Sequence, residues 1–270
     1  MRLAGHHAVV TGGGTGIGAA IARALAAEGA RLTLVGRRRD KLEETAASLR
    51  SSRAKSRGAG TDSELRPSTR LGTNEVVAVA PADVTDRAQV NAAFANARAA
   101  QGPITILVNN AGSATGIPFA KVRPELWRDM LAVNLDGMFH CCQAALPDLL
   151  AAPAGRIVTV ASMAGLYGFA YAAPYIAAKH GAVGLTRALA AEFAGTSLRV
   201  NALCPGFVDS DMTAATIANI SGKTGRSEAE ARAELARLNP AGRLIAPEEV
   251  AAAAVDLIAS QRNGEAVEIA

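Results

Sequence analysis

The sequence has few aromatic residues and no long apolar run, and each shortage excludes a class of protein. Aromatic residues make up 4% of the 270 residues, and lysine and arginine are scattered despite a net charge of +4. A nucleic-acid-binding protein would need a basic stripe with stacking aromatics. No apolar stretch reaches the ~18 residues of a membrane span. We expect neither nucleic acid nor a membrane as a partner, and a small phosphorylated ligand fits the charge better.

Cysteine and histidine are too few and too scattered for a disulfide framework or a metal site. Cys141, Cys142 and Cys204 cannot pair completely, and two of them are neighbours, so we expect core thiols in a reducing compartment. The four histidines lack metal-ligand spacing, and we predict no bound metal. The first residues run directly into a strand-like segment and leave no room for a secretory signal. We therefore expect a cytoplasmic protein.

Apolar, β-branched runs alternate with alanine-rich amphipathic stretches along the chain, which is typical of βαβ units. We predict one α/β domain over residues 1–270, a Rossmann-type doubly wound parallel sheet of seven strands with helices on both faces. The predicted strands are 6–12, 31–36, 75–80, 104–109, 155–161, 198–204 and 265–269. The predicted helices are 16–29, 38–50, 86–100, 124–151, 174–194 and 247–260.

Two segments interrupt this alternation. Residues 51–74 are polar and lack periodicity, so we interpret them as a mobile surface insertion, with a functional excursion as the alternative. Residues 206–240 follow the sixth strand at its carboxyl end, where open α/β sheets bind ligands. We predict that this second segment, called the lid segment below, covers the substrate.

A glycine-rich turn, Thr11-Gly12-Gly13-Gly14-Thr15-Gly16-Ile17-Gly18, joins the first strand to the first helix. Glycines here let the chain turn sharply and bring it close to a pyrophosphate, while the helix start supplies amide donors and a positive dipole end. A plain turn is the alternative. The position at the start of a βαβ unit favours dinucleotide binding by Gly12, Thr15, Gly16, Ile17 and Gly18.

The residues after the second strand indicate which dinucleotide binds. Gly36 is followed by Arg37, Arg38 and Arg39, where a carboxylate would bond a ribose 2′-hydroxyl and repel a 2′-phosphate. Arginine favours the phosphate through charge-assisted, often bidentate hydrogen bonds. We predict that Arg37 and Arg38 make NADP(H) the preferred cofactor. NAD(H) is the alternative if these side chains only solvate the helix start.

Tyr175 and Lys179 lie four residues apart where a helix begins, and Ser162 follows an apolar run upstream. Positions i and i+4 share a helix face, so the Lys179 ammonium lies near the Tyr175 phenol and favours its ionised form. That lowers a reference pKa of about 10 toward the range useful for general acid–base catalysis. Ser162 is the expected partner of the phenol. A partly buried tyrosine beside a snorkelling lysine is the structural alternative.

With the glycine-rich turn, the serine and Tyr-x-x-x-Lys in this order, the chain resembles the classical short-chain dehydrogenase/reductase family. The similarity runs from about residue 3 to the C-terminus and includes further motifs: Asp83-Val84, Asn109-Asn110-Ala111-Gly112, Asn134 and Pro205-Gly206. The resemblance implies an NAD(P)-dependent oxidoreductase. In such an enzyme the nicotinamide gives its hydride to a carbonyl carbon while Tyr175 donates a proton, and the reverse reaction oxidises an alcohol.

The resemblance also assigns roles to particular residues. It adds Asn134 to the catalytic set of Ser162, Tyr175 and Lys179, because the family's asparagine holds a water that passes protons to the lysine. Asp83 and Val84 would contact adenine, with an Asx-type turn as the alternative for the pair. The lysine would also grip the nicotinamide ribose. The other implied cofactor contacts are Asn110, Gly112, Tyr175, Pro205, Gly206, Val208 and Ser210.

Two features depart from the family pattern. Ser210 stands where the family often has threonine, and its hydroxyl would still reach the nicotinamide carboxamide. The chain stops at Ala270, directly after the last predicted strand, without the Asp-Gly-Gly tail of many relatives. Because that region often contributes to the family's tetramer, the expected homotetramer rests on the long fourth and fifth helices.

The expected substrate is a small molecule. Asn239-Pro240-Ala241-Gly242-Arg243 leading into Pro247 is similar to 3-oxoacyl reductases and 3-hydroxyacyl-CoA dehydrogenases, which suggests a 3-oxoacyl or 3-hydroxyacyl thioester. We expect an apolar lining, unless the same residues form core: Met163, Leu166, Tyr167, Phe169, Phe207, Met212 and Ile217. The lid segment also carries cations in an otherwise helix-prone stretch: Lys223, Arg226 and Arg232. They either bind the phosphates of a CoA or carrier-protein arm, or they only keep one face of a helix solvated.

Two other functions are compatible with the scaffold. One is a dehydrogenase for a sugar, a steroid or another secondary alcohol. The other, more remote, is a nucleotide-sensing protein without turnover. Such proteins commonly lose the catalytic tyrosine or lysine, whereas this chain retains both.

Overall fold

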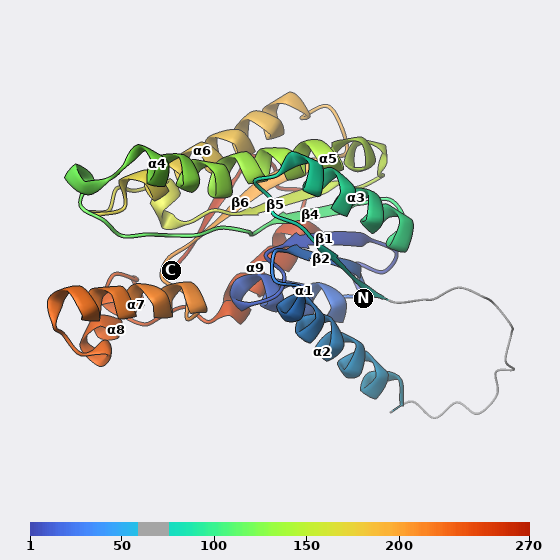
Figure 1. Cartoon of the computed structure of the whole chain (residues 1–270). Coiled ribbons are helices and arrows are strands. Elements are labelled where there is room, and N and C mark those ends of the chain that lie inside the picture. Colours follow the sequence, from blue (N-terminus) through green and yellow to red (C-terminus); the bar gives the residue numbers. More distant parts are fainter. Residues whose placement is uncertain (59–75) are drawn as a thin grey trace, which may run out of the picture.

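The computed structural model describes residues 1–58 and 76–270, which form a seven-stranded sheet with helices on both faces (Figure 1). All neighbouring strands pair in parallel, in the order β3-β2-β1-β4-β5-β6-β7. The predicted fold class is confirmed. The strands are β1 His7–Thr11, β2 Arg31–Gly36, β3 Val77–Pro81, β4 Ile106–Asn109, β5 Arg156–Val160, β6 Arg199–Pro205 and β7 Ala266–Ile269.

The helices form two layers, with α1, α2 and α9 on one face of the sheet and α3, α5 and α6 on the other (Figure 1). Val9 and Val10 show why the strands are apolar throughout, since these neighbours on β1 point into opposite cores. The helices are α1 Gly16–Ala27, α2 Arg39–Gly58, α3 Arg87–Gln101, α4 Pro124–Leu131, α5 Gly137–Ala151, α6 Ala173–Glu192, α7 Asp211–Thr224, α8 Glu228–Arg237 and α9 Pro247–Ala259. Short turns are η1 Phe119–Lys121, η2 Ala132–Asp136 and η3 Met163–Gly165.

Two helices differ from their predicted bounds. The predicted helix 38–50 continues to Gly58, because residues 51–57 contain neither proline nor glycine and include good helix formers. The rest of the predicted insertion, from residue 59, lies outside the described residues. The predicted helix 124–151 is interrupted by a π-helical turn, η2. Within η2 the Asn134 side chain donates to the Met130 carbonyl at 3.0 Å and so competes for an acceptor of the helical ladder.

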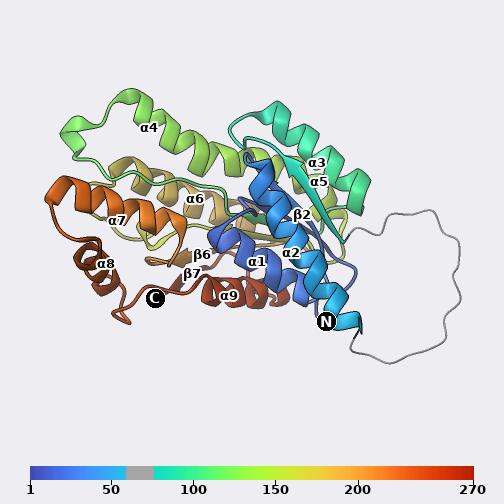
Figure 2. The ribbon, with the colours of Figure 1, turned by 60° about the horizontal axis from the view of Figure 1, so that its bottom comes forward.

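The lid segment folds into two helices, α7 and α8, which project to one side of the sheet in both views (Figures 1 and 2). They share a small apolar core that includes Ile217, Ala231 and Leu235. A capping box starts α8, since Ser227 Oγ accepts from the Glu230 amide at 3.2 Å and the Glu230 carboxylate accepts from the Ser227 amide at 2.9 Å. Within residues 1–58 and 76–270, every helix is too short or too polar to cross a bilayer.

Candidate active site

A cleft of about 250 Å³ opens at the carboxyl ends of the strands, where the strand order reverses between β1 and β4. Doubly wound sheets bind their ligands at this switch point, and we call it the switch-point cleft. Segments that follow β1, β2, β3 and β4 line it, together with the start of α7. The predicted cofactor residues among its walls are Gly12, Thr15, Gly16, Ile17, Arg37, Arg38, Asp83, Val84, Asn110, Gly112 and Ser210.

The glycine-rich turn has the geometry that a pyrophosphate requires. Gly12 and Gly16 have φ angles of 64° and 51°, in the left-handed region that favours glycine. Gly18 lies outside the cleft lining and has a packing role, since a Cβ there would lie 2.2 Å from the Gly12 carbonyl oxygen. The N-terminus of α1 therefore approaches the cleft closely, with amide donors and its positive dipole end. These residues fit a dinucleotide.

Two predicted cofactor residues also brace the walls of the cleft. Asn110 Nδ2 donates to the carbonyls of Thr11 and Gly12 at 3.0 and 3.3 Å, which ties β4 to β1. Asp83 Oδ1 accepts from the amide and the hydroxyl of Thr85, at 3.0 and 2.8 Å. The Asx-type turn proposed as the structural alternative for Asp83 therefore exists, in a residue that also faces the cleft.

Arg37 and Arg38, which follow β2, line the switch-point cleft as predicted. Arg38 Nη2 donates to Thr15 Oγ1 at 3.3 Å, so both side chains meet at one wall of the switch-point cleft. The Arg37 side chain is 73% exposed, and its Nη1 lies 4.0 Å from an Asp83 carboxylate oxygen. This corner of the cleft thus has guanidinium and hydroxyl donors available for a phosphate.

The loop after β6 contains residues of two kinds. Ser210 lines the switch-point cleft, whereas Pro205, Gly206 and Val208 lie outside the lining. Pro205 ends β6, Gly206 lies against Asn239, and buried Val208 pairs with Ile245. Their observed contacts support the loop that presents Ser210.

Ser162 and Tyr175 meet because η3 packs tightly on α6. A Cβ on Gly165 would lie 2.8 Å from the Lys179 carbonyl oxygen, so only glycine permits this approach. Ser162 Oγ accepts from the Ala164 amide at 3.1 Å. Burial raises the pKa of the Tyr175 phenol above its usual value, and the neighbouring Ser162 hydroxyl opposes this shift by a smaller amount.

The Lys179 side chain is buried beneath the phenol. Its Nζ donates to the Val160 carbonyl at 2.9 Å and lies 5.7 Å from the centroid of the Tyr175 ring. Burial lowers the pKa of Lys179 to about 8. The expected net lowering of the Tyr175 pKa is wrong for this structure, because desolvation of the phenol dominates and raises the pKa.

Asn134, the fourth residue of the predicted catalytic group, lies near Lys179, with which it lines a small cavity. It is buried in η2, where Nδ2 also donates to the Ser113 carbonyl at 3.0 Å. A cavity of about 10 Å³ is lined by Asn134, Lys179 and Asn109. Asn109 Oδ1 is buried without a hydrogen-bond partner among the residues that the structure describes. The cavity suits roughly one water molecule.

The switch-point cleft contains residues that the sequence did not predict, and some residues predicted to line the substrate pocket lie elsewhere. Lys41, Val133 and Asp211 line the switch-point cleft without having been predicted. Asp211 follows Ser210 directly, which was the one available signal. Met212, predicted as apolar lining, also lies in the cleft wall. Of the expected apolar lining, Phe207 and Ile217 belong instead to the core of the lid segment, because α7 and α8 need apolar surface of their own. Tyr167 is exposed and donates to Glu268 at 2.6 Å.

Comparisons with known proteins agree with this geometry. A family model described as short chain dehydrogenase matches residues 6–76 and 61–221. A putative ketoacyl reductase of the granaticin polyketide synthase from Streptomyces violaceoruber is 40% identical over 93% of this chain and 86% of its own length. Galactitol 2-dehydrogenase (L-tagatose-forming) from Cereibacter sphaeroides is 39% identical over 95% of this chain and 89% of its own.

A solved structure extends the likeness to the whole fold. The crystal structure of an actinorhodin polyketide ketoreductase with NADPH has a TM-score of 0.86 and 34% identity, and the match covers 98% of this chain and 95% of that one. Strand order, glycine-rich turn, Ser162 and the Tyr175–Lys179 pair agree with these similarities. The chain belongs to the classical short-chain dehydrogenase/reductase family and is an oxidoreductase that uses a nicotinamide dinucleotide.

Proposed function

We propose that this enzyme transfers a hydride reversibly between NADP(H) and the 3-oxo group of an acyl thioester. The observation that carries the chemistry is the convergence of Ser162, Tyr175 and Lys179. The three lie outside the lining of the switch-point cleft but next to its wall, since a Cβ on Gly112 in that wall would lie 3.7 Å from Lys179 Nζ. A non-catalytic sensor would have no use for this set, so we set that alternative aside.

Side chains of the protein bind and protonate the carbonyl oxygen of the substrate. When bound, the cofactor supplies or accepts the hydride. Ser162 donates a hydrogen bond to the carbonyl oxygen, and Tyr175 gives its proton to the same oxygen as negative charge develops. Lys179 stabilises the phenolate that remains, and Asn134 adjoins the small cavity through which a water would return the proton.

Arg38 and Thr15 support NADP(H) as the preferred cofactor. Their contact at the end of β2 places a guanidinium and a hydroxyl where the adenosine ribose of a dinucleotide lies in this fold. The similar polyketide ketoreductase was solved with NADPH, which agrees. A carboxylate, the usual partner of a free 2′-hydroxyl, is replaced here by arginine.

The substrate class rests on the ketoacyl reductase relatives and on the exposed surface of the site. Met212 is exposed and lines the switch-point cleft, which supports an apolar acyl chain as part of the substrate. Of the three predicted phosphate-binding cations, Arg226 pairs with Glu234 and Arg232 with Asp209. Lys223 donates only to the Gly116 carbonyl, at 3.2 Å, among its described contacts. Of these three, Lys223 is therefore best placed to meet a phosphate of a carrier arm.

A panel of carbonyl compounds tests this proposal. NADPH oxidation should be followed with acetoacetyl-CoA, longer 3-oxoacyl thioesters, simple ketones, ketoses and steroid ketones at equal concentrations. We expect the largest kcat/KM with a thioester. Activity with thioesters no better than with the best ketone would remove the thioester proposal while leaving the oxidoreductase assignment intact.

Oxidation of a polyol is the second candidate, and the galactitol 2-dehydrogenase relative favours it at almost the same identity. A polyol substrate would have several hydroxyls to satisfy by hydrogen bonds, and the pocket would reject analogues that lack them. NADP⁺ and NAD⁺ reduction with galactitol and other sugar alcohols separates the two candidates. A kcat/KM for a polyol above that for every thioester would favour this alternative.

We also propose a cytoplasmic homotetramer. Exposed apolar side chains on η1, α4 and α5 support a subunit contact through these elements: Phe119, Trp127, Phe139 and Leu150. Sedimentation equilibrium should give four times the chain mass of 27.5 kDa. A monomer at micromolar concentration would remove the assembly proposal.

A further inference from the structure

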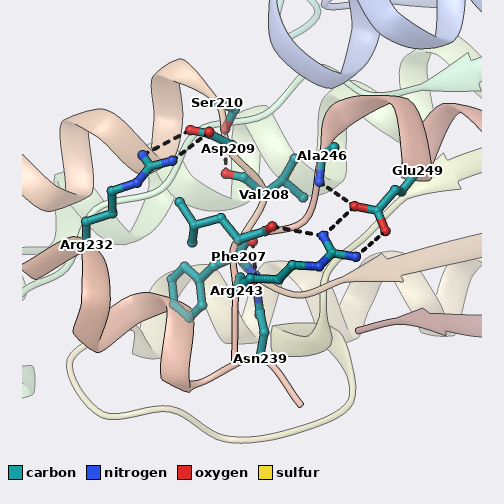
Figure 3. A network of polar contacts seen from close by, with 10 residues as sticks. Phe207, Val208, Asp209, Ser210, Arg232, Asn239, Arg243, Ala246 and Glu249 are labelled. Atoms are coloured by element: carbon teal, nitrogen blue, oxygen red, sulfur yellow. Dashed lines mark hydrogen bonds and ion pairs between the residues drawn. The ribbon is translucent and has the colours of Figure 1, made fainter. Parts of the chain in front are cut away.

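Asn239, at the end of the lid segment, holds the loop after β6 through three hydrogen bonds (Figure 3). It is 2% exposed. Its Oδ1 accepts from the Phe207 amide at 2.8 Å, and its Nδ2 donates to the carbonyls of Phe207 and Arg243 at 2.9 and 2.7 Å. One side chain thereby bonds both backbone groups of Phe207. The Phe207 carbonyl also accepts from the Ile245 amide at 3.0 Å, so the Phe207 amide is the group that loss of Asn239 would leave unpaired, which is costly.

Gly206 lacks a side chain at the point where Asn239 enters. A Cβ on Gly206 would lie 2.3 Å from Asn239 Oδ1 and 3.2 Å from Met163 Sδ. Gly206 is not among the glycines with left-handed φ, so backbone torsion does not demand glycine here. Glycine is required at position 206 because Asn239 fills the space that a Cβ would need. Met163, the residue after catalytic Ser162, is also close to that space.

The loop held by Asn239 leads directly to the switch-point cleft. Val208 pairs with Ile245, and the Asp209 amide donates to the Ile245 carbonyl at 2.8 Å. Arg232 on α8 adds two bonds to the Asp209 carboxylate, at 3.1 and 2.6 Å (Figure 3). These two side chains are about half exposed, so their ion pair contributes little. The buried side-chain amide of Asn239 is the stronger link between the end of the lid segment and the loop, residues 206–210, that carries Ser210.

We propose that Asn239 is a positioning residue for cofactor binding. It sets the path of residues 206–210, and through them the place of Ser210 at the cleft, without touching the cofactor itself. The inference rests on the nicotinamide part of the proposed function and is independent of the carbonyl substrate. Loss of Asn239 should therefore change cofactor affinity more than turnover at saturating cofactor.

The test uses Asn239→Leu, which keeps the branched shape of the side chain, with methyl groups in place of Oδ1 and Nδ2, and removes all three bonds. Asn263 offers a matched control: its Oδ1 accepts from the Val200 amide and its Nδ2 donates to the Ala190 carbonyl, both at 2.9 Å, near the amino end of β6. Calorimetric titration with NADPH and NADH, without carbonyl substrate, should show a Kd raised roughly tenfold or more for Asn239→Leu. Asn263→Leu should lower Tm and leave Kd unchanged.

A double-mutant cycle with Gly206→Ala gives a second measurement, useful if the leucine variant does not fold. Gly206→Ala alone should weaken cofactor binding, and its effect should shrink by roughly fivefold or more in an Asn239→Ala background, where the space is free. Additive effects, or a Kd for Asn239→Leu within about twofold of the parent enzyme, would overturn the proposal. Inactivity toward thioesters would bear only on the proposed substrate.

Discussion

The Nζ of Lys179 lies 5.7 Å from the centroid of the Tyr175 ring and donates to the Val160 carbonyl at 2.9 Å. The ammonium is thus anchored to the end of β5, beneath the phenol that it serves. Its burial lowers the Lys179 pKa to about 8. The charge that stabilises a phenolate is therefore present below about pH 8 and is lost above it.

The rate of carbonyl reduction should follow this titration. We expect kcat/KM to be highest below about pH 8 and to fall as the pH rises beyond it, because neutral Lys179 no longer stabilises the phenolate. In Lys179→Arg the charge persists, so the alkaline limb should move to higher pH even if the rate is lower. Profiles from pH 6 to pH 10 test this, and an unmoved limb in the arginine variant would assign it to another group.

Removal of the Tyr175 hydroxyl should abolish turnover and spare the cofactor site. General acid–base catalysis contributes about 10²- to 10⁴-fold, so Tyr175→Phe should lower kcat by at least about 100-fold. Ser162→Ala should also slow turnover, because the carbonyl oxygen loses a donor. Steady-state kinetics and an NADPH titration of each variant give the answer. Retained activity in Tyr175→Phe would overturn the acid role.

Arg38 should determine the preference between the two cofactors. Hydrogen bonds to charged groups contribute about 1.5–3 kcal/mol, so Arg38→Ala should raise KM for NADPH by roughly 10- to 100-fold and leave KM for NADH nearly unchanged. Arg39→Ala is the matched control, since Arg39 is exposed at the start of α2 outside the switch-point cleft. Equal losses for both cofactors would place the 2′-phosphate elsewhere.

Alanine substitutions at Gly18 and Gly222 should have opposite effects on stability, because Gly18 is packed against Gly12, whereas the space that a Cβ on Gly222 would occupy is open. A Cβ at Gly18 would meet the Gly12 carbonyl at 2.2 Å, so Gly18→Ala should destabilise the fold by about 1–3 kcal/mol and weaken NADPH binding. Gly222 on α7 has nothing within 4 Å of such a Cβ. Gly222→Ala should stabilise by up to about 1 kcal/mol through helix propensity. Urea unfolding of both variants is the measurement, and similar shifts in one direction would refute the packing argument.

His7 should make the fold sensitive to acid. The ring is buried, with Nδ1 at 2.8 Å from the Gly102 carbonyl and Nε2 at 2.9 Å from Thr33 Oγ1, and burial lowers its pKa from 6.5 to about 4. Between pH 6.5 and about pH 4 the His7 ring binds a proton in the unfolded chain but not in the folded chain. The free energy of unfolding should therefore decrease as the pH is lowered across this window, by about 3 kcal/mol in total.

The His7 prediction is tested by comparing unfolding free energies at pH 7 and pH 4.5. His7→Gln should reduce the loss between the two conditions, whereas His180→Gln, at an exposed position on α6, should not. Other titrating groups contribute equally in all three proteins, so the difference isolates His7. The same loss in parent and His7→Gln proteins would exclude it as the acid-sensitive group.

Several parts of the site were predictable because their physical cause is local. The glycine-rich turn lies between strand and helix in the sequence, and the Tyr175–Lys179 spacing places both residues on one face of α6. The sign of the Tyr175 pKa shift was not predictable, because it depends on how deeply the phenol is buried and on which acceptor the Lys179 ammonium reaches. The lid segment was predicted to contain only a helix-prone stretch and not the two helices α7 and α8. Their few apolar residues form a small separate cluster with Phe207 and Leu244, so their apolar pattern is weak.

By itself, the sequence determined the parallel sheet, the dinucleotide turn and the catalytic residue types, since each depends on side-chain period and on neighbours along the chain. Only the tertiary structure decided that Gly18 packs against the Gly12 carbonyl and Gly206 against Asn239. It also decided that Asn109 borders the small cavity and that Asn239 bonds the backbone of Phe207. These relationships join segments far apart in the chain, and packing distance, which no local pattern encodes, sets them.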